Sequence, residues 1–209
     1  MSIKNNEENK NLEEQILKVA EETFLDKGYA MTSMAEIAKR AGCNQALIHY
    51  YFRTKERLFV LLFEKKFATL ISTVFTQSDK HPLFKDRLRA VVLGHIAAIA
   101  EHPKLPFLII NEMTLNAEKY HPAAEMLKIK VSGLLEDMDK ELHEEYLKGT
   151  IREIKAVDLL LLILSLNVFV FLAQPIYSQI KGLDYDEYME FAQGRGEVNF
   201  ETIWKSISC

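Results

Sequence analysis

Cysteine is scarce in this sequence, with only Cys43 and Cys209 among 209 residues. Two cysteines so far apart form no disulfide framework, so we expect a protein of the reducing cytoplasm. The N-terminal residues are polar and acidic, and they include no apolar segment that could serve as a secretion signal. We expect residues 1–10 to form a flexible arm.

Long hydrophobic runs are also lacking. The most apolar segment, 157–173, is shorter than the about 20 residues that a spanning helix needs, and it contains Asp158, Ser165 and Asn167 before Pro175. We therefore expect no membrane partner. A helix that is apolar on all sides must be buried on all sides, which a single small domain rarely achieves without a partner. We therefore interpret the segment as a subunit-interface helix. An internal core helix is the alternative.

Patterns typical of catalysis are missing too. The sequence has no nucleophile with a base at informative spacing, no glycine-rich phosphate loop and no cluster of metal ligands. His95 and His102 are too far apart on one helix to share a metal, and His121 with Glu125 is an isolated pair. We expect no enzyme, no cofactor and no metal site; acid–base catalysis in a helical body stays as an alternative.

An excess of positive charge is the last notable absence. The chain has 26 Lys and Arg against 30 Asp and Glu, a net charge of −4, and residues 1–55 hold eight of each kind. Nonspecific affinity for DNA comes mainly from basic contacts to phosphate, so charge alone does not predict a DNA-binding protein.

Three short helical patterns and two tight turns are present between residues 12 and 58. The first pattern repeats apolar residues every four positions from Leu12 to Phe24 and stops at Gly28, which can adopt a left-handed cap. Ser33, three residues ahead of Glu36, has the spacing of a helix cap that begins the second pattern.

The third pattern follows a turn at Gly42 and a second cap at Asn44, so the two helices must cross at a steep angle. Its apolar face consists of Ile48, Tyr51 and Phe52. The opposite face carries Gln45, Ala46, His49, Tyr50 and Arg53. These residues can hydrogen-bond, pack on thymine methyl groups or meet phosphates, but they do not suggest bond-making chemistry. We interpret this surface as one that reads DNA.

The runs ILKVAEETF, TSMAEIAKRAG and YYFRTKERL resemble the DNA-binding domain of the TetR family of bacterial transcriptional regulators, over about residues 12–63. The Gly-Tyr after the first helix, the Ile-Ala pair, the Ala-Gly turn and the Tyr-Phe before Thr-Lys-Glu all agree in order and spacing. The resemblance implies an all-α protein with a helix-turn-helix domain at residues 11–55 and a larger effector-binding and dimerisation domain at residues 56–209.

The resemblance also implies a homodimeric repressor that a small-molecule effector releases from a palindromic operator in double-stranded DNA. By position, it assigns base contacts to Gln45, Ala46, Leu47 and Tyr50, and phosphate contacts to Thr32, Ser33, His49, Tyr51 and Lys55. Two reading helices held about 34 to 36 Å apart would read both half-sites in one binding event.

The rest of the chain reads as successive helices without a strand pattern. We expect helices near 54–75, 82–102, 105–116, 122–147, 157–173 and 184–207, with glycines weakening the last one. The predicted dimer interface uses helices about 156–178 and 184–207. The predicted wall of an effector cavity consists of His95, Phe107, Glu112, Met113, Tyr120, Phe169 and Phe171. The alternative for each of them is an ordinary position in the hydrophobic core.

The second alternative function is a helical module that binds a partner protein, and the neutral N-terminal region favours it. Affinity for DNA that falls steeply with salt distinguishes the regulator from such a module.

Overall fold

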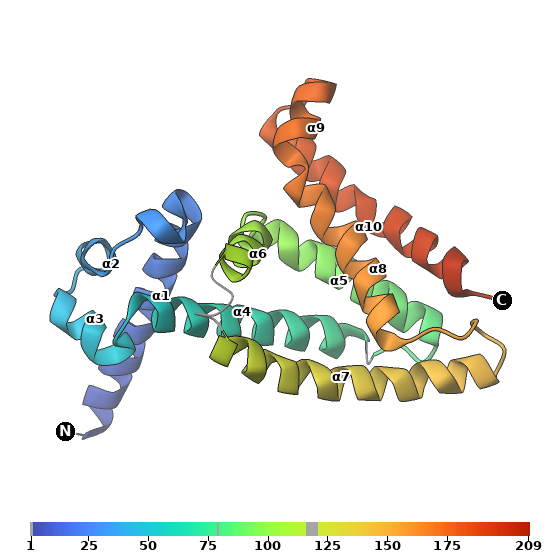
Figure 1. Ribbon diagram of the computed structural model, residues 1–209, viewed down its shortest axis with the longest axis horizontal. Helices are drawn as coiled ribbons and strands as arrows, with labels where there is room; N and C mark the ends of the chain where they lie inside the picture. The colour runs from blue at the N-terminus through green and yellow to red at the C-terminus, as the bar shows by residue number, and fades with distance from the viewer. Residues whose placement is uncertain (1, 79, 116–120) are drawn as a thin grey trace. The chain divides into compact units, whose positions relative to one another are not determined.

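A computed structural model describes residues 2–78, 80–115 and 121–209 of the chain, without the side chains at 2–10, 67, 70, 71, 73–78, 113, 121–127, 129 and 130. The helices are α1 (Ser2–Met31), α2 (Met34–Arg40), α3 (Gln45–Phe52), α4 (Lys55–Ser78), α5 (Phe84–Glu101), α6 (Leu105–Leu115), α7 (His121–Leu147), α8 (Ala156–Leu172), α9 (Gln174–Lys181) and α10 (Tyr185–Ile207) (Figure 1). The described residues contain no strand, only an isolated bridge between Ile151 and Ser208. The predicted all-α class is therefore confirmed.

The first helix differs from its predicted extent. α1 begins at Ser2, so the backbone of residues 2–10 is helical, while the flexibility of residues 1–10 stays a prediction. A helix that has nucleated extends by one hydrogen bond per added residue, which permits this continuation into a polar segment. The predicted stop at Gly28 is confirmed, because its backbone leaves helical geometry at φ 77° and ψ 166°.

The chain divides into two compact units, Met1–Phe67 with Leu108–Tyr120 and Ala68–Phe107 with His121–Cys209. The first unit contains α1, α2 and α3, and the second contains α5 and α7–α10. The predicted boundary between residues 55 and 56 lies inside the first unit. The assignment of DNA binding and effector binding to 11–55 and 56–209 stays a prediction.

The core of the first unit is built on an aromatic cluster. The Phe24 ring stacks on Tyr29 at 5.7 Å between centroids, and Phe59 packs edge-on against both rings at 5.4 and 5.2 Å. Other fully buried side chains in this unit are Ile16, Ala20, Ile37, Ile48 and Leu58. The predicted inward faces of the first three helical patterns supply most of these residues.

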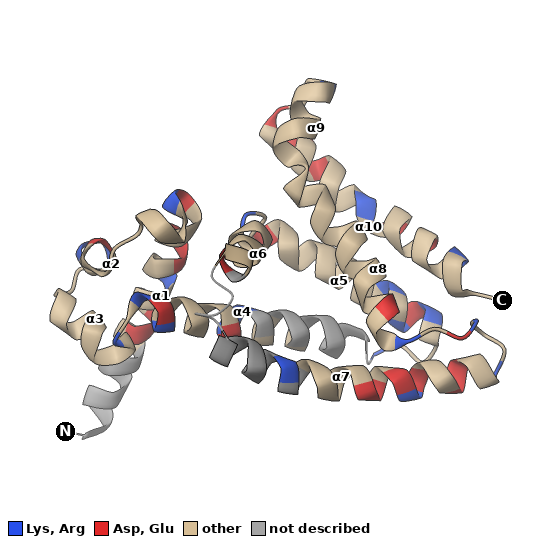
Figure 2. Cartoon of the chain, in the orientation of Figure 1, with Lys and Arg blue, Asp and Glu red and all other residues tan. Residues whose placement is uncertain are grey.

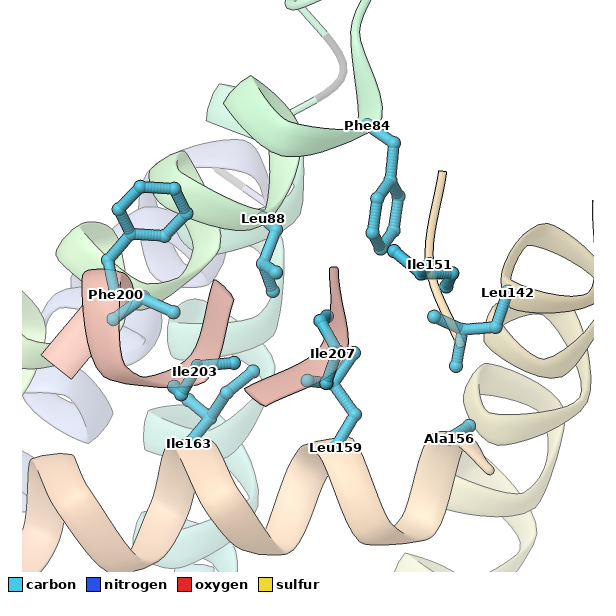
Figure 3. Packing of buried hydrophobic residues seen from close by; sticks show 11 residues of the cluster. Phe84, Leu88, Leu142, Ile151, Ala156, Leu159, Ile163, Phe200, Ile203 and Ile207 are labelled. Carbon is cyan, nitrogen blue, oxygen red and sulfur yellow. The ribbon is translucent and has the colours of Figure 1, made fainter. Parts of the chain in front are cut away.

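The core of the second unit joins α5, α7, α8 and α10 (Figure 3). The cluster consists of Phe84, Leu88, Val92, Leu142, Ile151, Ala156, Leu159, Ile163, Phe200, Ile203 and Ile207. The Arg152 N–H donates to the Ile207 carbonyl at 2.7 Å, which attaches the C-terminal end to the segment before α8. The start of α8 is capped from α7, because the Ala156 N–H donates to the Asp139 carboxylate at 2.8 Å.

The last helix is continuous through both of its glycines. A Cβ added at Gly196 would lie 3.1 Å from Ile96 and 3.2 Å from Leu93 on α5, whereas one added at Gly194 would meet nothing within 4 Å. Gly196 therefore permits the close approach of α5 and α10. The expected weakening of this helix is offset by tertiary packing.

The apolar segment is divided into two helices. α8 ends at Leu172 and α9 starts at Gln174 at an angle of 60°. The predicted helix at 157–173 and its interruption at Pro175 are confirmed, because Pro175 lacks an N–H and its ring clashes with a helical carbonyl four residues back. The range predicted for the dimer interface, 156–178, therefore crosses this break, and its role in dimerisation stays a prediction. Over the described residues no single helix is long and apolar enough to span a membrane. Only the bent pair α8–α9, taken together, has the length and the apolar composition of a membrane span.

Candidate DNA-binding interface

Capping hydrogen bonds fix where α2 and α3 begin. The Ser33 hydroxyl accepts from the Glu36 N–H at 3.2 Å, and the Asn44 side chain accepts from the Leu47 N–H at 2.8 Å. Both predicted caps are confirmed. The turn between the helices has Gly42 at φ 69°, and Gln15 of α1 donates to the Ala41 carbonyl at 3.2 Å. Local caps therefore fix the two helices of the helix-turn-helix, and Gln15 of α1 contacts the turn between them.

α3 has one buried and one exposed face. Ile48 and Phe52 are buried, whereas Gln45, Ala46 and His49 are exposed and Tyr50 is 79% exposed. Leu47 and Tyr51 are half-buried. The helix contains no Lys, Arg, Asp or Glu (Figure 2). Any reading of bases by α3 must therefore use amide, imidazole, phenol and apolar groups.

The residues predicted to contact phosphate differ in their exposure to solvent and in their hydrogen bonds within the protein. Ser33 and His49 are exposed and Tyr51 is half-buried. Thr32 is 2% exposed, and its hydroxyl donates to the Gly28 carbonyl at 2.8 Å. Its side chain therefore serves the turn between α1 and α2. Its assignment to phosphate stays a prediction.

Lys55 is also engaged within the protein. Its Nζ donates to the Tyr29 carbonyl at 2.9 Å and the Thr32 carbonyl at 2.8 Å, and it lies 4.2 Å from the centroid of the Tyr29 ring. An ammonium group has three hydrogens, so two are used by these carbonyls. Lys55 thus joins the start of α4 to the turn before α2. Its phosphate contact stays a prediction.

Several other cations of this unit are paired with neighbouring carboxylates. Lys27 pairs with Glu36, and Arg40 lies 3.4 Å from Asp26 and donates to the Thr23 hydroxyl at 2.9 Å. Each of these cations lies beside a carboxylate that offsets its charge. The surface around α2 therefore has cations but no strong basic patch. Sequence reasoning gave Arg40 no role, because its partners lie on α1, more than ten residues earlier.

The end of α3 contains the one non-glycine residue with positive φ among the described residues. Arg53 has φ 61° and ψ −57°, a region that side chains rarely occupy. The Arg53 carbonyl lies 2.9 Å from His49 Nδ1, and Gln45 Nε2 lies 3.3 Å from His49 Nε2. No sequence signal predicts a positive φ at an arginine, so this arrangement was missed.

The family model for bacterial regulatory proteins of the tetR family matches residues 16–62, which include α2 and α3 in full. The chain belongs to the TetR family. It is a transcriptional regulator, as the matched relatives are.

One relative of this TetR-family regulator is the fatty acid metabolism regulator protein of Bacillus subtilis, 29% identical over 142 residues, which cover 66% of this chain and 70% of that protein. A second is the transcriptional activator FasR of Mycolicibacterium smegmatis, 32% identical over 98 residues, which cover 47% of this chain and 44% of that protein. The match thus spans less than half the length of FasR.

Solved structures confirm the fold over nearly the whole chain. The regulator FadR from Bacillus subtilis, solved in complex with stearoyl-CoA, has a TM-score of 0.70 at 24% identity and covers 90% of this chain and 96% of its own. FadR from Bacillus halodurans has a TM-score of 0.69 at 22% identity and covers 92% and 94%.

The predicted effector residues of this TetR-family protein belong to both units. His95 and Phe171 are buried in the second unit, and Glu112 is buried in the first. Phe107 and Phe169 are 62% and 67% exposed. The Met113 side chain and Tyr120 lie outside the described residues. Their shared role in a cavity wall stays a prediction.

His95 is part of a polar network inside the second unit. Asn167 Nδ2 donates to the Val92 carbonyl at 2.9 Å and lies 3.2 Å from His95 Nδ1, while Asn199 donates to Asn167 Oδ1 at 2.9 Å. Burial lowers the pKa of His95 from 6.5 to about 4. The imidazole is therefore neutral at physiological pH, with Nδ1 as an acceptor for the amide.

Proposed function

We propose that this regulator is a homodimeric repressor that binds a palindromic operator through α3 and is released by a small-molecule effector. The observation that carries the DNA-binding part is the exposed, uncharged face of α3, which presents Gln45, Ala46, His49 and Tyr50 between two capped helix ends. Amide and imidazole groups read base edges in the major groove.

Dimerisation is supported by apolar residues on the outer faces of α8 and α10. Val157, Leu161 and Phe169 of α8 are 47%, 56% and 67% exposed, and Phe191 and Val198 of α10 are 38% and 46% exposed. The opposite face of α8 is buried in the core through Leu159 and Ile163. An apolar surface of this kind marks an interaction site, and a two-fold pair of α8 and α10 would cover it.

The proposed effector is a fatty acyl thioester of coenzyme A. The similarity to a fatty acid metabolism regulator extends over 142 residues, well beyond the helix-turn-helix, and a neighbour in fold holds stearoyl-CoA. Mostly apolar helices such as α5 and α8 are suited to an acyl chain. Effector binding in the second unit would change the separation of the two reading helices, with α4 shared by both units.

The test is binding of the purified protein to its own upstream DNA, with footprinting, a salt titration and added stearoyl-CoA. We expect a protected palindrome, steep salt dependence, and a loss of affinity of about 5- to 150-fold at saturating effector. Free coenzyme A, which lacks the acyl chain, is the ligand control. Absence of a footprint at low salt would refute operator binding, and unchanged binding with acyl-CoA would refute the effector class alone.

A matched pair of tyrosine variants tests the reading face. Tyr50→Ala should relax sequence preference, whereas Tyr146→Ala, an exposed tyrosine of α7, should leave it unchanged. Equal preferences in both variants would argue against α3 as the reading helix.

A further inference from the structure

We propose that His49 is a positioning residue: it holds the Gln45 side chain with its amide oxygen outward, so that the protein selects adenine over guanine at the base that Gln45 meets. The proposal rests on the proposed DNA-binding role of α3 and names a determinant of its specificity. Both residues are exposed on α3, one helical turn apart.

The first step is the tautomer of His49. Its Nδ1 lies 2.9 Å from the Arg53 carbonyl oxygen, which can only accept a hydrogen bond. Nδ1 must therefore carry the hydrogen and donate it. A neutral imidazole has only one N–H, so Nε2 of the same ring is left as an acceptor.

The second step is the orientation of Gln45. Its Nε2 lies 3.3 Å from His49 Nε2. Because the ring nitrogen is an acceptor, only the amide NH2 group can face it favourably; the amide oxygen would place two acceptors in contact. One hydrogen of the NH2 group is thus used by His49, and the second hydrogen and the amide oxygen Oε1 remain for a ligand.

The backbone of Arg53 explains why the carbonyl lies within reach of the ring. Arg53 ends α3 with its N–H donating to the His49 carbonyl at 3.0 Å, and then turns to positive φ. The next hydrogen bond, from the Thr54 N–H to the Phe52 carbonyl at 2.7 Å, closes this turn. His49 is therefore bound to Arg53 through both its backbone and its ring, which holds the imidazole in place.

The third step is the match to base edges. Adenine offers the N6 amino group as a donor and N7 as an acceptor, which suits an outward oxygen and the remaining amide hydrogen. Guanine offers the acceptors O6 and N7, so the outward oxygen of Gln45 would face O6 without a hydrogen between them. A good bidentate contact discriminates against the wrong base by about 5- to 150-fold. Without His49, the amide can rotate and present NH2 to guanine.

The tautomer is tested first, in the protein without DNA. Nitrogen NMR of histidine-labelled wild-type protein, with His49 assigned through its loss in His49→Phe, should show Nδ1 protonated and Nε2 unprotonated. A ring protonated on Nε2, or one that averages both forms, would overturn the proposal. Since this measurement needs no operator, it is independent of the DNA-binding role.

Base preference is tested by selection from a randomised half-site library. The position read by Gln45 is the one at which Gln45→Ala loses its preference, and wild-type protein should prefer adenine there over guanine by about 5- to 150-fold. His49→Phe should reduce that preference toward none while keeping the preferences at other positions. His143→Phe, an exposed histidine of α7, is the control and should select as wild type.

Two outcomes of the selection overturn the positioning role: His49→Phe retains the wild-type preference at that position, or the wild type selects guanine there. Failure of every variant, including wild type, to enrich any sequence would instead refute DNA binding. A destabilised His49→Phe, detected by circular dichroism, leaves the tautomer measurement on wild-type protein as the deciding result.

Discussion

The Lys55 ammonium group holds the start of α4 against the turn between α1 and α2 through two backbone carbonyls. Hydrogen bonds from charged donors contribute about 1.5 to 3 kcal/mol each when partly buried, and the two share one side chain. We expect Lys55→Ala to lower the free energy of unfolding by about 2 kcal/mol in urea titrations. Lys39→Ala, an exposed lysine of α2, should change it by less than about 0.5 kcal/mol.

The same variant separates a structural role from a phosphate contact. If Lys55 also contacts phosphate, Lys55→Ala reduces the salt slope of operator binding by about one unit. Equal stability of the Lys55→Ala and Lys39→Ala proteins would contradict the structural role.

His95 makes stability depend on pH because its pKa is about 4 in the folded protein and 6.5 in the unfolded chain. Between these values the unfolded state binds more protons, so the stability present above pH 6.5 is lost as the pH falls toward 4. The loss at about pH 5 should be about 2 kcal/mol. Urea titrations from about pH 7.5 to 4.5 would measure it.

The control for this pH dependence is His95→Gln, which keeps an acceptor for Asn167 but does not titrate. Its stability should fall much less over the interval. Wild type and variant with parallel pH profiles would refute a buried neutral imidazole. Glu145, whose pKa is lowered by its hydrogen bond with Lys148, loses its contribution only below the ordinary carboxylate pKa and affects both proteins equally.

At the scale of helices, the contact between α5 and α10 depends on the size of one residue. Gly194→Ala should raise the free energy of unfolding by about 0.5 to 1 kcal/mol, because alanine favours a helix and meets nothing there. Gly196→Ala should forfeit that gain, since its Cβ would press on Ile96 and Leu93. Denaturant titrations of the two variants measure the difference in their free energies of unfolding. Equal increases in both variants would show that α5 can shift to accommodate the added methyl group without loss of stability.

At the scale of the whole molecule, the proposed dimer interface on the outer face of α8 can be tested through the oligomeric state. Leu161→Glu places a charge in the proposed interface, so sedimentation equilibrium should show a shift from dimer to monomer. Leu147→Glu, at an equally apolar and 70% exposed position on α7, should remain dimeric. A dimeric Leu161→Glu protein, or a monomeric wild type, would refute this interface.

Monomerisation should also weaken operator binding. A single α3 reads one half-site, and the second half-site no longer adds to affinity within the same binding event. Leu161→Glu should therefore lose the symmetric footprint that Leu147→Glu retains.

Local features of this protein were determined by the sequence. The caps at Ser33 and Asn44, the stop at Gly28 and the break at Pro175 involve groups within four residues of each other, so spacing alone predicts them. The apolar repeats gave the helices and the inward faces of α1–α3, and the combined motifs predicted the family.

Only the tertiary structure decided which polar side chains form hydrogen bonds within the protein and which apolar side chains are exposed. The partners of Lys55 lie 26 and 23 residues earlier in the chain, and Asn167 meets His95 across 72 residues. Phe169 and Phe171 are two residues apart on α8, yet one is exposed and the other is buried. Such outcomes depend on how helices dock, because burial and long-range hydrogen bonds arise from packing that no local spacing encodes.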